Sequence, residues 1–180
     1  IWFSFFVYLL RNFTGESDSK KNFAFFAEVL SGIENWREED RINCTVIYFI
    51  LKILRGEGLL SSPEHCLACE KKFSETEKTF YALGETGLLC ASCFRQSKID
   101  PDFQKNISFD YLEFTPLTEL IPRPEKDFGV SGEVRNLLIQ AEKSPDLESC
   151  YTKIFLGSKI NGQLILQSRN FLLYSLVSLI

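Results

Sequence analysis

Four of the chain's six cysteines fall in two Cys-x-x-Cys pairs, a spacing typical of metal ligands. The first pair is Cys66 and Cys69, the second is Cys90 and Cys93, and 20 residues separate the two pairs. Two intervening residues let both sulfurs of one tight turn reach a single ion about 2.3 Å away at tetrahedral angles. Two such turns supply a closed shell of four thiolates. The spacing therefore predicts one structural Zn²⁺ ion.

Other chemistries share parts of this pattern and stay open at this point. Two disulfides require an oxidising compartment, and a redox dithiol requires one Cys-x-x-Cys at the start of a helix after a strand. An iron–sulfur cluster uses the same four ligands. His65, the chain's only histidine, precedes Cys66 and is an alternative ligand. Since a catalytic zinc needs an open coordination position, a structural zinc is the favoured interpretation.

Residues 63–97 are predicted to form a small module around these cysteines. The segments KTFYAL and GLLC are expected to be short strands of a hairpin, joined through residues 84–87. So few residues bury little surface, and metal binding, worth roughly 10–16 kcal/mol in zinc-finger peptides, is expected to decide whether the module folds. Nearby cations offset the excess negative charge of four thiolates, namely Lys71, Lys72, Arg95 and Lys98.

Residues 1–62 and 98–180 are predicted to form a helical domain that carries this module. The clearest helix is REEDRINCTVIYFILKILRGEG, in which apolar residues at helical spacing form one continuous stripe. Acidic residues open this helix, and Gly56 is a natural end. Cys44 lies inside it and is interpreted as a small buried apolar residue. The predicted fold class is therefore mainly α, a helical bundle with an inserted zinc module.

Further helices are predicted on both sides of the module. One follows the break at TGESDSKKN, and another, SGEVRNLLIQAEK, is capped by Ser131 and ends before Pro145. The segments DLESCYTKIFLGSKI and LILQSRNFLLYSLVSLI supply the remaining helices. Four prolines interrupt the pattern between residues 100 and 130, which predicts an irregular connector with a short strand in FDYLEFTPL.

Composition limits the class of protein. The 180 residues are 45% hydrophobic and 14% aromatic, which predicts a packed core. The net charge of −4 becomes −6 with four thiolates and one Zn²⁺, and an acidic chain binds a phosphate backbone poorly. The apolar runs at the two ends are about ten residues each, too short for a bilayer. They resemble parts of longer elements, so we expect either a piece of a longer protein or a sequence from which some residues are missing.

No catalytic constellation is evident in the sequence. One histidine beside a cysteine pair does not assemble a Ser/His/Asp or Cys/His site. The phosphate-binding patterns G-x-x-x-x-G-K-[ST] and G-x-G-x-x-G are missing. The acidic residues 38–40 suit a helix start better than a pair of catalytic carboxylates. A non-enzymatic binding or scaffold role is therefore expected.

Three features occur in order along the chain. An apolar helix ends in IYFILKILRGEGLLSSPEHC and runs into the first cysteine pair. The paired motifs CLAC and GLLCASC follow, and the tail LGSKINGQLILQSRNFLLYSL places Ser168 and Arg169 before an apolar helix. Together these features resemble the C-terminal helical and zinc-binding region of the bacterial recombination mediator RecO. The resemblance covers nearly the whole chain. Its specificity comes from order and spacing, because the zinc motif alone is common.

The resemblance implies a non-catalytic DNA-repair protein of the bacterial cytoplasm, associated with the nucleoid. RecO proteins bind single- and double-stranded DNA and anneal complementary strands. With RecR they help to load RecA onto strands coated by single-strand-binding protein. Their fold is an N-terminal OB barrel followed by a helical domain with the zinc module. The helical domain docks the acidic, apolar C-terminal tail of single-strand-binding protein.

The chain departs from this family pattern in two ways. Nothing before Cys66 shows the alternating strands of an OB barrel, and the net charge is acidic. DNA binding is therefore expected to be weak and salt-sensitive, with candidate contacts at Lys71, Lys72, Arg95, Lys98 and Arg169. Two other functions stay open: a zinc-stapled interaction adaptor unrelated to recombination, and a non-catalytic piece of a larger enzyme.

Overall fold

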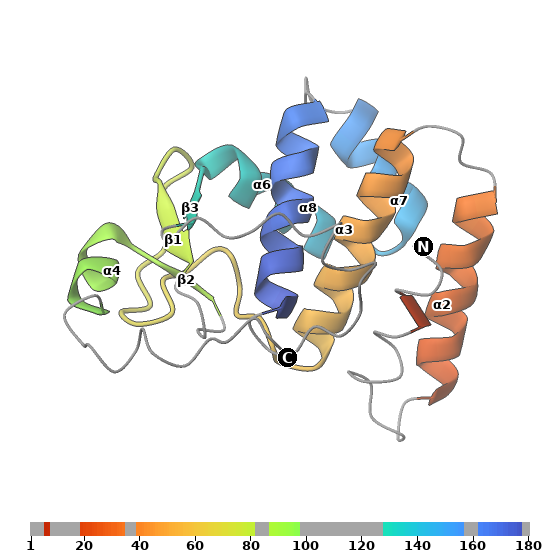
Figure 1. Cartoon of the computed structure of the whole chain (residues 1–180), viewed down its shortest axis with the longest axis horizontal. Helices are drawn as coiled ribbons and strands as arrows, with labels where there is room; N and C mark the ends of the chain where they lie inside the picture. The colour runs from red at the N-terminus through yellow and green to blue at the C-terminus, as the bar shows by residue number, and fades with distance from the viewer. Residues whose placement is uncertain are drawn as a thin grey trace.

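The computed structural model describes residues 6–7, 19–34, 39–81, 87–97, 128–156 and 162–177. These residues form a mainly helical structure with a small three-stranded antiparallel sheet and a cluster of cysteines, which confirms the predicted fold class. The long helices pack side by side, and the sheet and the short helix α4 (Ala91–Ser97) lie to one side of them (Figure 1). The expectation that an OB barrel is missing stays a prediction.

Helix α3 (Glu39–Gly56) is the centre of the helical body, which comprises α3 and the helices that pack around it. It packs against α2 (Ser19–Glu34), α6 (Gly132–Glu142), α7 (Leu147–Tyr151) and α8 (Gly162–Val177). Residues 43–51 are all buried, as expected for a helix that other helices surround. A short π-helical segment, η3 (Thr152–Leu156), continues α7. Within the described ranges, no helix has the length and apolar character needed to cross a membrane.

Local signals in the sequence determine where several helices begin and end. Ser131 caps α6 as predicted, because its hydroxyl oxygen accepts a hydrogen bond from the N–H of Val134. Asp146 caps α7 in the same way and accepts from a backbone N–H three residues later at 2.7 Å. Helix α3 ends at the predicted Gly56, and the chain then turns at Gly58, whose φ of 70° favours glycine.

The predicted hairpin is present, and a third strand extends it. Strand β1 (Thr79–Tyr81) pairs antiparallel with β2 (Leu88–Leu89), so that Phe80 lies opposite Leu89. Strand β3 (Phe128–Val130), which the sequence pattern does not predict, pairs antiparallel with the other side of β1. The strand predicted in FDYLEFTPL lies outside the described residues. Because β3 leads directly into α6, the sheet connects the cysteine module to the helical body.

Aromatic side chains hold the module together and attach it to the body. Phe80 of β1 stacks on Phe94 of α4, with ring centroids 4.5 Å apart. Tyr81 meets Phe171 of α8 edge to face, with centroids 5.4 Å apart. The predicted division of the chain around residues 63–97 stays a prediction, and β3 joins the sheet of the module from beyond that range.

Replacing Gly132 with alanine is expected to destabilise the chain by about 1–3 kcal/mol, as overpacking typically does. An alanine Cβ at this position would collide with the main-chain carbonyl of Glu75, which a side-chain rotation cannot relieve. Gly129→Ala is the matched control, since its Cβ would meet only the flexible end of Lys78. Urea unfolding followed by circular dichroism measures both variants, and equal stabilities would contradict the close contact at Gly132.

Candidate metal centre

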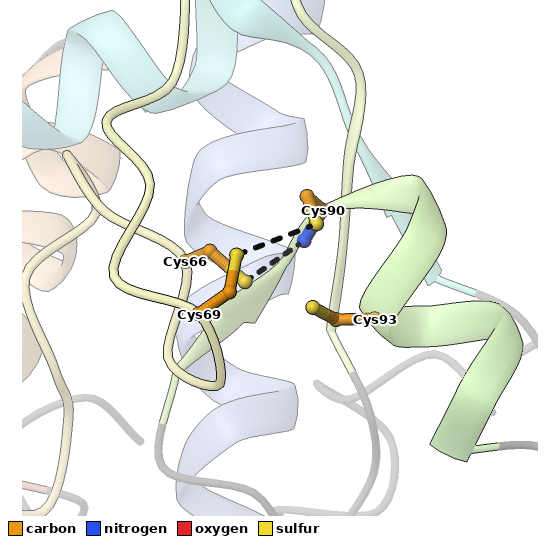
Figure 2. Close-up of side chains that lie close together, drawn as sticks. All are labelled: Cys66, Cys69, Cys90 and Cys93. Carbon is orange, nitrogen blue, oxygen red and sulfur yellow. Dashed lines mark hydrogen bonds between the residues drawn. The ribbon is translucent and has the colours of Figure 1, made fainter.

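Figure 2 shows the four predicted cysteines gathered in one cluster. The sulfurs of Cys66, Cys69, Cys90 and Cys93 all lie within 4.8 Å of one another, and those of Cys69 and Cys90 are 3.9 Å apart. In a tetrahedral site with metal–sulfur bonds of about 2.3 Å, neighbouring sulfurs are about 3.8 Å apart. The geometry is therefore compatible with one metal ion bound among the four thiols.

Main-chain hydrogen bonds close the turn that presents the first cysteine pair. The N–H of Cys66 donates to the carbonyl of Lys71 at 2.9 Å, and the N–H of Glu70 donates to the carbonyl of Cys66 at 2.9 Å. Glu70 adopts a left-handed conformation with a φ of 59°, which costs roughly 1–2 kcal/mol for a residue other than glycine. The turn brings Cys69 back beside Cys66, so that both sulfurs belong to one cluster.

The second cysteine pair joins the end of β2 to the start of α4. Cys90 directly follows β2, and Cys93 lies in the first turn of α4, where the N–H of Phe94 donates to the carbonyl of Cys90 at 2.9 Å. The N–H of Cys90 also donates to the sulfur of Cys66 at 3.3 Å, as a dashed line in Figure 2 marks. This hydrogen bond joins the two cysteine turns directly.

Burial and hydrogen bonding change the acidity of the thiols. Cys66 is 1% exposed and Cys90 is 3% exposed, whereas Cys69 lies at the surface. Burial raises the pKa of Cys90, but hydrogen bonds from the Ser92 hydroxyl, the Cys93 N–H and neighbouring thiols outweigh burial and lower this pKa to about 6. The hydrogen bond with Cys90 raises the pKa of Cys93 to about 12. The cluster therefore carries negative charge near neutral pH, which favours a cation.

Three of the predicted cations lie on the surface of the module. Lys71, Lys72 and Arg95 are all exposed. Lys71 forms an ion pair with Glu77 at 3.1 Å, and this contact, with a smaller contribution from the thiols, raises the pKa of Lys71. Arg95 donates to a carbonyl of its own helix at 3.2 Å. Lys98 lies outside the described residues.

Arg169, the fifth predicted contact, belongs to the helical body. It lies with Ser168 inside α8 (Gly162–Val177), so the prediction that this pair stands before the final helix is wrong. Its guanidinium donates to the side-chain oxygen of Asn43 on α3 at 2.7 Å and to that of Asn170 at 3.3 Å. Burial lowers the pKa of Arg169. The adjacent Ser168 is buried and donates to the carbonyl of Leu164 at 2.9 Å. Both residues of the Ser-Arg pair therefore make contacts within the body, and a DNA contact at Arg169 stays a prediction.

The histidine and the other two cysteines stand apart from the cluster. His65 is exposed and forms a main-chain bridge with Lys72, and the group of possible ligands found among the described residues contains no histidine. Cys44 on α3 and Cys150 on α7 are fully buried, with their sulfurs 3.9 Å apart. The hydrogen bond with Cys150, together with burial, raises the pKa of Cys44. These contacts confirm the interpretation of Cys44 as a small buried residue.

Two residues that contact the cysteine module carry no sequence signal of their role. The hydroxyl of Ser92 lies 3.1 Å from the sulfur of Cys90. Arg135, 2% exposed on α6, donates to the main-chain carbonyls of Ser74 and Glu77, which follow the first cysteine pair. A serine is ordinary at any surface position, and every residue has a main-chain carbonyl. Neither contact is therefore evident from residue types and spacing.

Comparison with known proteins found no matching family model, no similar curated protein and no similar solved structure. The resemblance to RecO therefore depends on the order and spacing of motifs in this one sequence. The metal-binding chemistry depends on the geometry of the cysteine cluster itself.

Replacing Cys90 with serine is expected to reduce the metal content from about one ion per chain to about half or less, because a neutral hydroxyl replaces a thiolate ligand. The thermal midpoint is expected to fall by roughly 5 °C or more. Elemental mass spectrometry and calorimetry measure the two effects. Cys44→Ala is the control, since it removes a buried cysteine outside the cluster and should leave the metal content unchanged. An undiminished metal content in Cys90→Ser would remove Cys90 from the ligand set.

Metal affinity is expected to rise with pH, because a metal ion must displace the protons on the thiols. The proton of Cys93, whose pKa is about 12, has to be displaced at any pH near neutral. Below about pH 6 the thiol of Cys90 is protonated as well, so affinity should fall more steeply there than at pH 7 to 8. Competition with a chromophoric chelator measures the slope. A slope that stays constant through pH 6 would contradict the lowered pKa of Cys90.

Proposed function

We propose that the four cysteines hold one structural Zn²⁺ ion. Four cysteine sulfurs within 4.8 Å of one another, deprotonated when a metal binds, would fill a tetrahedral shell, which zinc prefers and which leaves no position for a substrate. An iron–sulfur cluster contains several metal ions and needs its cysteines farther apart than a single ion does, so the sulfur distances favour one ion. The chemistry of the zinc would be to fix the module in its fold and not to catalyse a reaction.

We infer further that the chain is the helical and zinc-binding region of a RecO-type mediator of DNA repair and homologous recombination. The observation that carries this inference is the order of motifs in the sequence: an apolar helix, two cysteine pairs, and a final apolar helix that contains the Ser-Arg pair. The role is non-catalytic. It belongs to the bacterial cytoplasm, at the nucleoid.

The packing of the chain supports treating these motifs as one functional unit. The first apolar helix is α3, and the final one is α8, which packs along α3 in the body. The module contacts the same final helix through Tyr81 and Phe171, whose ring centroids are 5.4 Å apart. Segments that are distant in the sequence therefore support one another, as expected if the region acts as a whole.

The mediator would act by bringing together a coated DNA strand and its recombinase. The helical body would dock the acidic, apolar tail of single-strand-binding protein, in the manner of an apolar segment entering a groove between helices. RecR would join this complex and assist the loading of RecA. Direct DNA contact by the described residues would be weak, because the exposed cations Lys71, Lys72 and Arg95 belong to a chain with a net charge of −4.

A zinc-stapled adaptor unrelated to recombination is the second candidate function. The acidic net charge favours it over a DNA-binding role, and Lys71 is already paired with Glu77 at 3.1 Å. An adaptor would use the same zinc module to present a protein-binding surface. It would bind neither single-stranded DNA nor the tail of single-strand-binding protein.

Titration of the zinc-loaded chain with a peptide copying the C-terminal tail of single-strand-binding protein tests the mediator function. Isothermal calorimetry should show saturable binding at micromolar affinity, and elemental analysis of the same sample should find zinc and not iron. A peptide of the same composition in scrambled order is the control and should not bind. No binding by a folded, zinc-loaded sample would favour the adaptor.

Weak DNA binding can be assigned to the module with a paired set of variants. Lys72→Ala/Arg95→Ala removes two exposed cations of the module, and Lys153→Ala removes an exposed cation of η3 in the body. The first variant should bind a labelled single strand more weakly and with a salt slope lower by roughly one to two, whereas the second should match the parent chain. Fluorescence anisotropy at roughly 50 and 200 mM salt measures both. Equal losses in the two variants would indicate that binding is not localised to the module.

A further inference from the structure

A buried arginine connects the helical body to the cysteine module. Arg135 lies on α6, is 2% exposed, and donates hydrogen bonds to the main-chain carbonyls of Ser74 and Glu77. Its guanidinium also lies over the ring of Phe73, with Cζ 4.9 Å from the ring centroid. All three partners belong to residues 73–77, which directly follow the first cysteine turn, so these contacts of the buried charge all come from the module.

The carbonyls of Ser74 and Glu77 stay within reach of Arg135 only while residues 73–77 keep this fold. The N–H of Phe73 donates to the carbonyl of Glu64 at 2.9 Å. This hydrogen bond holds the start of the segment beside Glu64, which lies just before the first cysteine turn. The N–H of Glu77 donates to the carbonyl of Ser74 at 3.1 Å, and the Glu77 carboxylate accepts from the N–H of Ser74 at 3.2 Å, which closes residues 74–77 into one turn. Lys71 of the cysteine turn adds an exposed ion pair to Glu77 at 3.1 Å, which contributes little by itself. The cysteine turn at residues 66–71 therefore positions the carbonyls that Arg135 uses.

A charged guanidinium remains ionised at any pH near neutral, so it cannot avoid the loss of its acceptors by releasing a proton. A buried charge that loses its partners destabilises the structure around it far more than an exposed charge does. Arg135 is fully enclosed by the body and the module, and the first residue of its helix, Gly132, lies against the main chain of Glu75. The start of α6 therefore cannot shift toward the module to bring the guanidinium of Arg135 to other acceptors.

We propose that Arg135 couples metal occupancy of the cysteine cluster to the stability of α6. Loss of the metal loosens the first cysteine turn, the carbonyls of Ser74 and Glu77 move away, and the start of α6 opens to solvate the guanidinium. Coupling between two sites is reciprocal, so the same contact strengthens metal binding. This inference rests on the proposed metal centre, and it adds a path by which the metal acts on the body.

Other contacts between the module and the body are less sensitive to the fold of the first cysteine turn. Lys143 of α6 forms an ion pair with Glu64 at 2.9 Å, but the side chain of Lys143 is 62% exposed, and exposed ion pairs contribute little. Tyr81 and Phe171 meet through apolar rings and leave no charge unpaired when they separate. Arg135 is therefore the contact whose loss should report the state of the cluster.

Hydrogen exchange of the full chain, with zinc and after chelation, tests the coupling. In the parent chain, chelation should speed exchange of α6 amides by about tenfold or more, and by less in the centre of α3. In Arg135→Met, which replaces the charge with an apolar chain of similar length, chelation should change α6 exchange less than about threefold. If α6 exchange in the parent chain is the same with and without zinc, the coupling is wrong. No variant is needed for that result, so it stands even if Arg135→Met fails to fold.

Reciprocal measurements separate coupling from ordinary packing. Zinc affinity, measured by competition with a chelator, should fall by about tenfold in Arg135→Met and by less in Arg135→Lys, which keeps the charge but not the two-pronged donor. Lys143→Met removes the exposed ion pair and should keep the parent affinity. Equal affinities in Arg135→Met and the parent chain would overturn the coupling alone. A parent chain that binds no metal would overturn both this inference and the metal centre.

Discussion

Four sulfurs have to meet at one point, and this requirement governs the shape of the cysteine module. Cys66 and Cys93 come from the two ends of the module, yet their sulfurs lie within 4.8 Å of each other. The left-handed residue Glu70, the hairpin and the start of α4 all serve this convergence. Thiolates held so close together repel one another unless a proton or a cation compensates their charge. Charge compensation in the cluster is therefore the interaction on which the module depends.

The contacts that join the module to the helical body depend on the cluster to different degrees. The pairing of β1 with β3 and the contact between Tyr81 and Phe171 use elements that lie beyond the first cysteine turn. Arg135 instead uses carbonyls at Ser74 and Glu77, whose positions follow from that turn. The module thus shares a sheet, an aromatic contact and a buried charge with the body, and its fold is not energetically separate from that of α6.

The features that could be predicted from the sequence are those in which the information is local. The spacing within each cysteine pair, the cap at Ser131 and the apolar repeat of α3 each concern residues only a few positions apart, and the structure contains all three. Strand β3 consists of three residues that pair with a partner about fifty positions away, so no periodicity reveals it. The role of Arg135 escapes prediction for a related reason, because its partners are main-chain carbonyls and carry no residue-type signal.

A metal ion enclosed by four sulfurs would contribute stability and leave function to the surfaces of the chain. The Ser-Arg pair that contributes to the RecO resemblance also makes contacts that stabilise the fold. Arg169 donates to Asn43 of α3 at 2.7 Å, and two residues later Phe171 meets Tyr81 of the module. The arginine therefore fixes α8 against α3 just before the point where α8 supports the module. A motif in this position aligns the last helix with both partners, so packing alone supplies a reason for its place in the sequence.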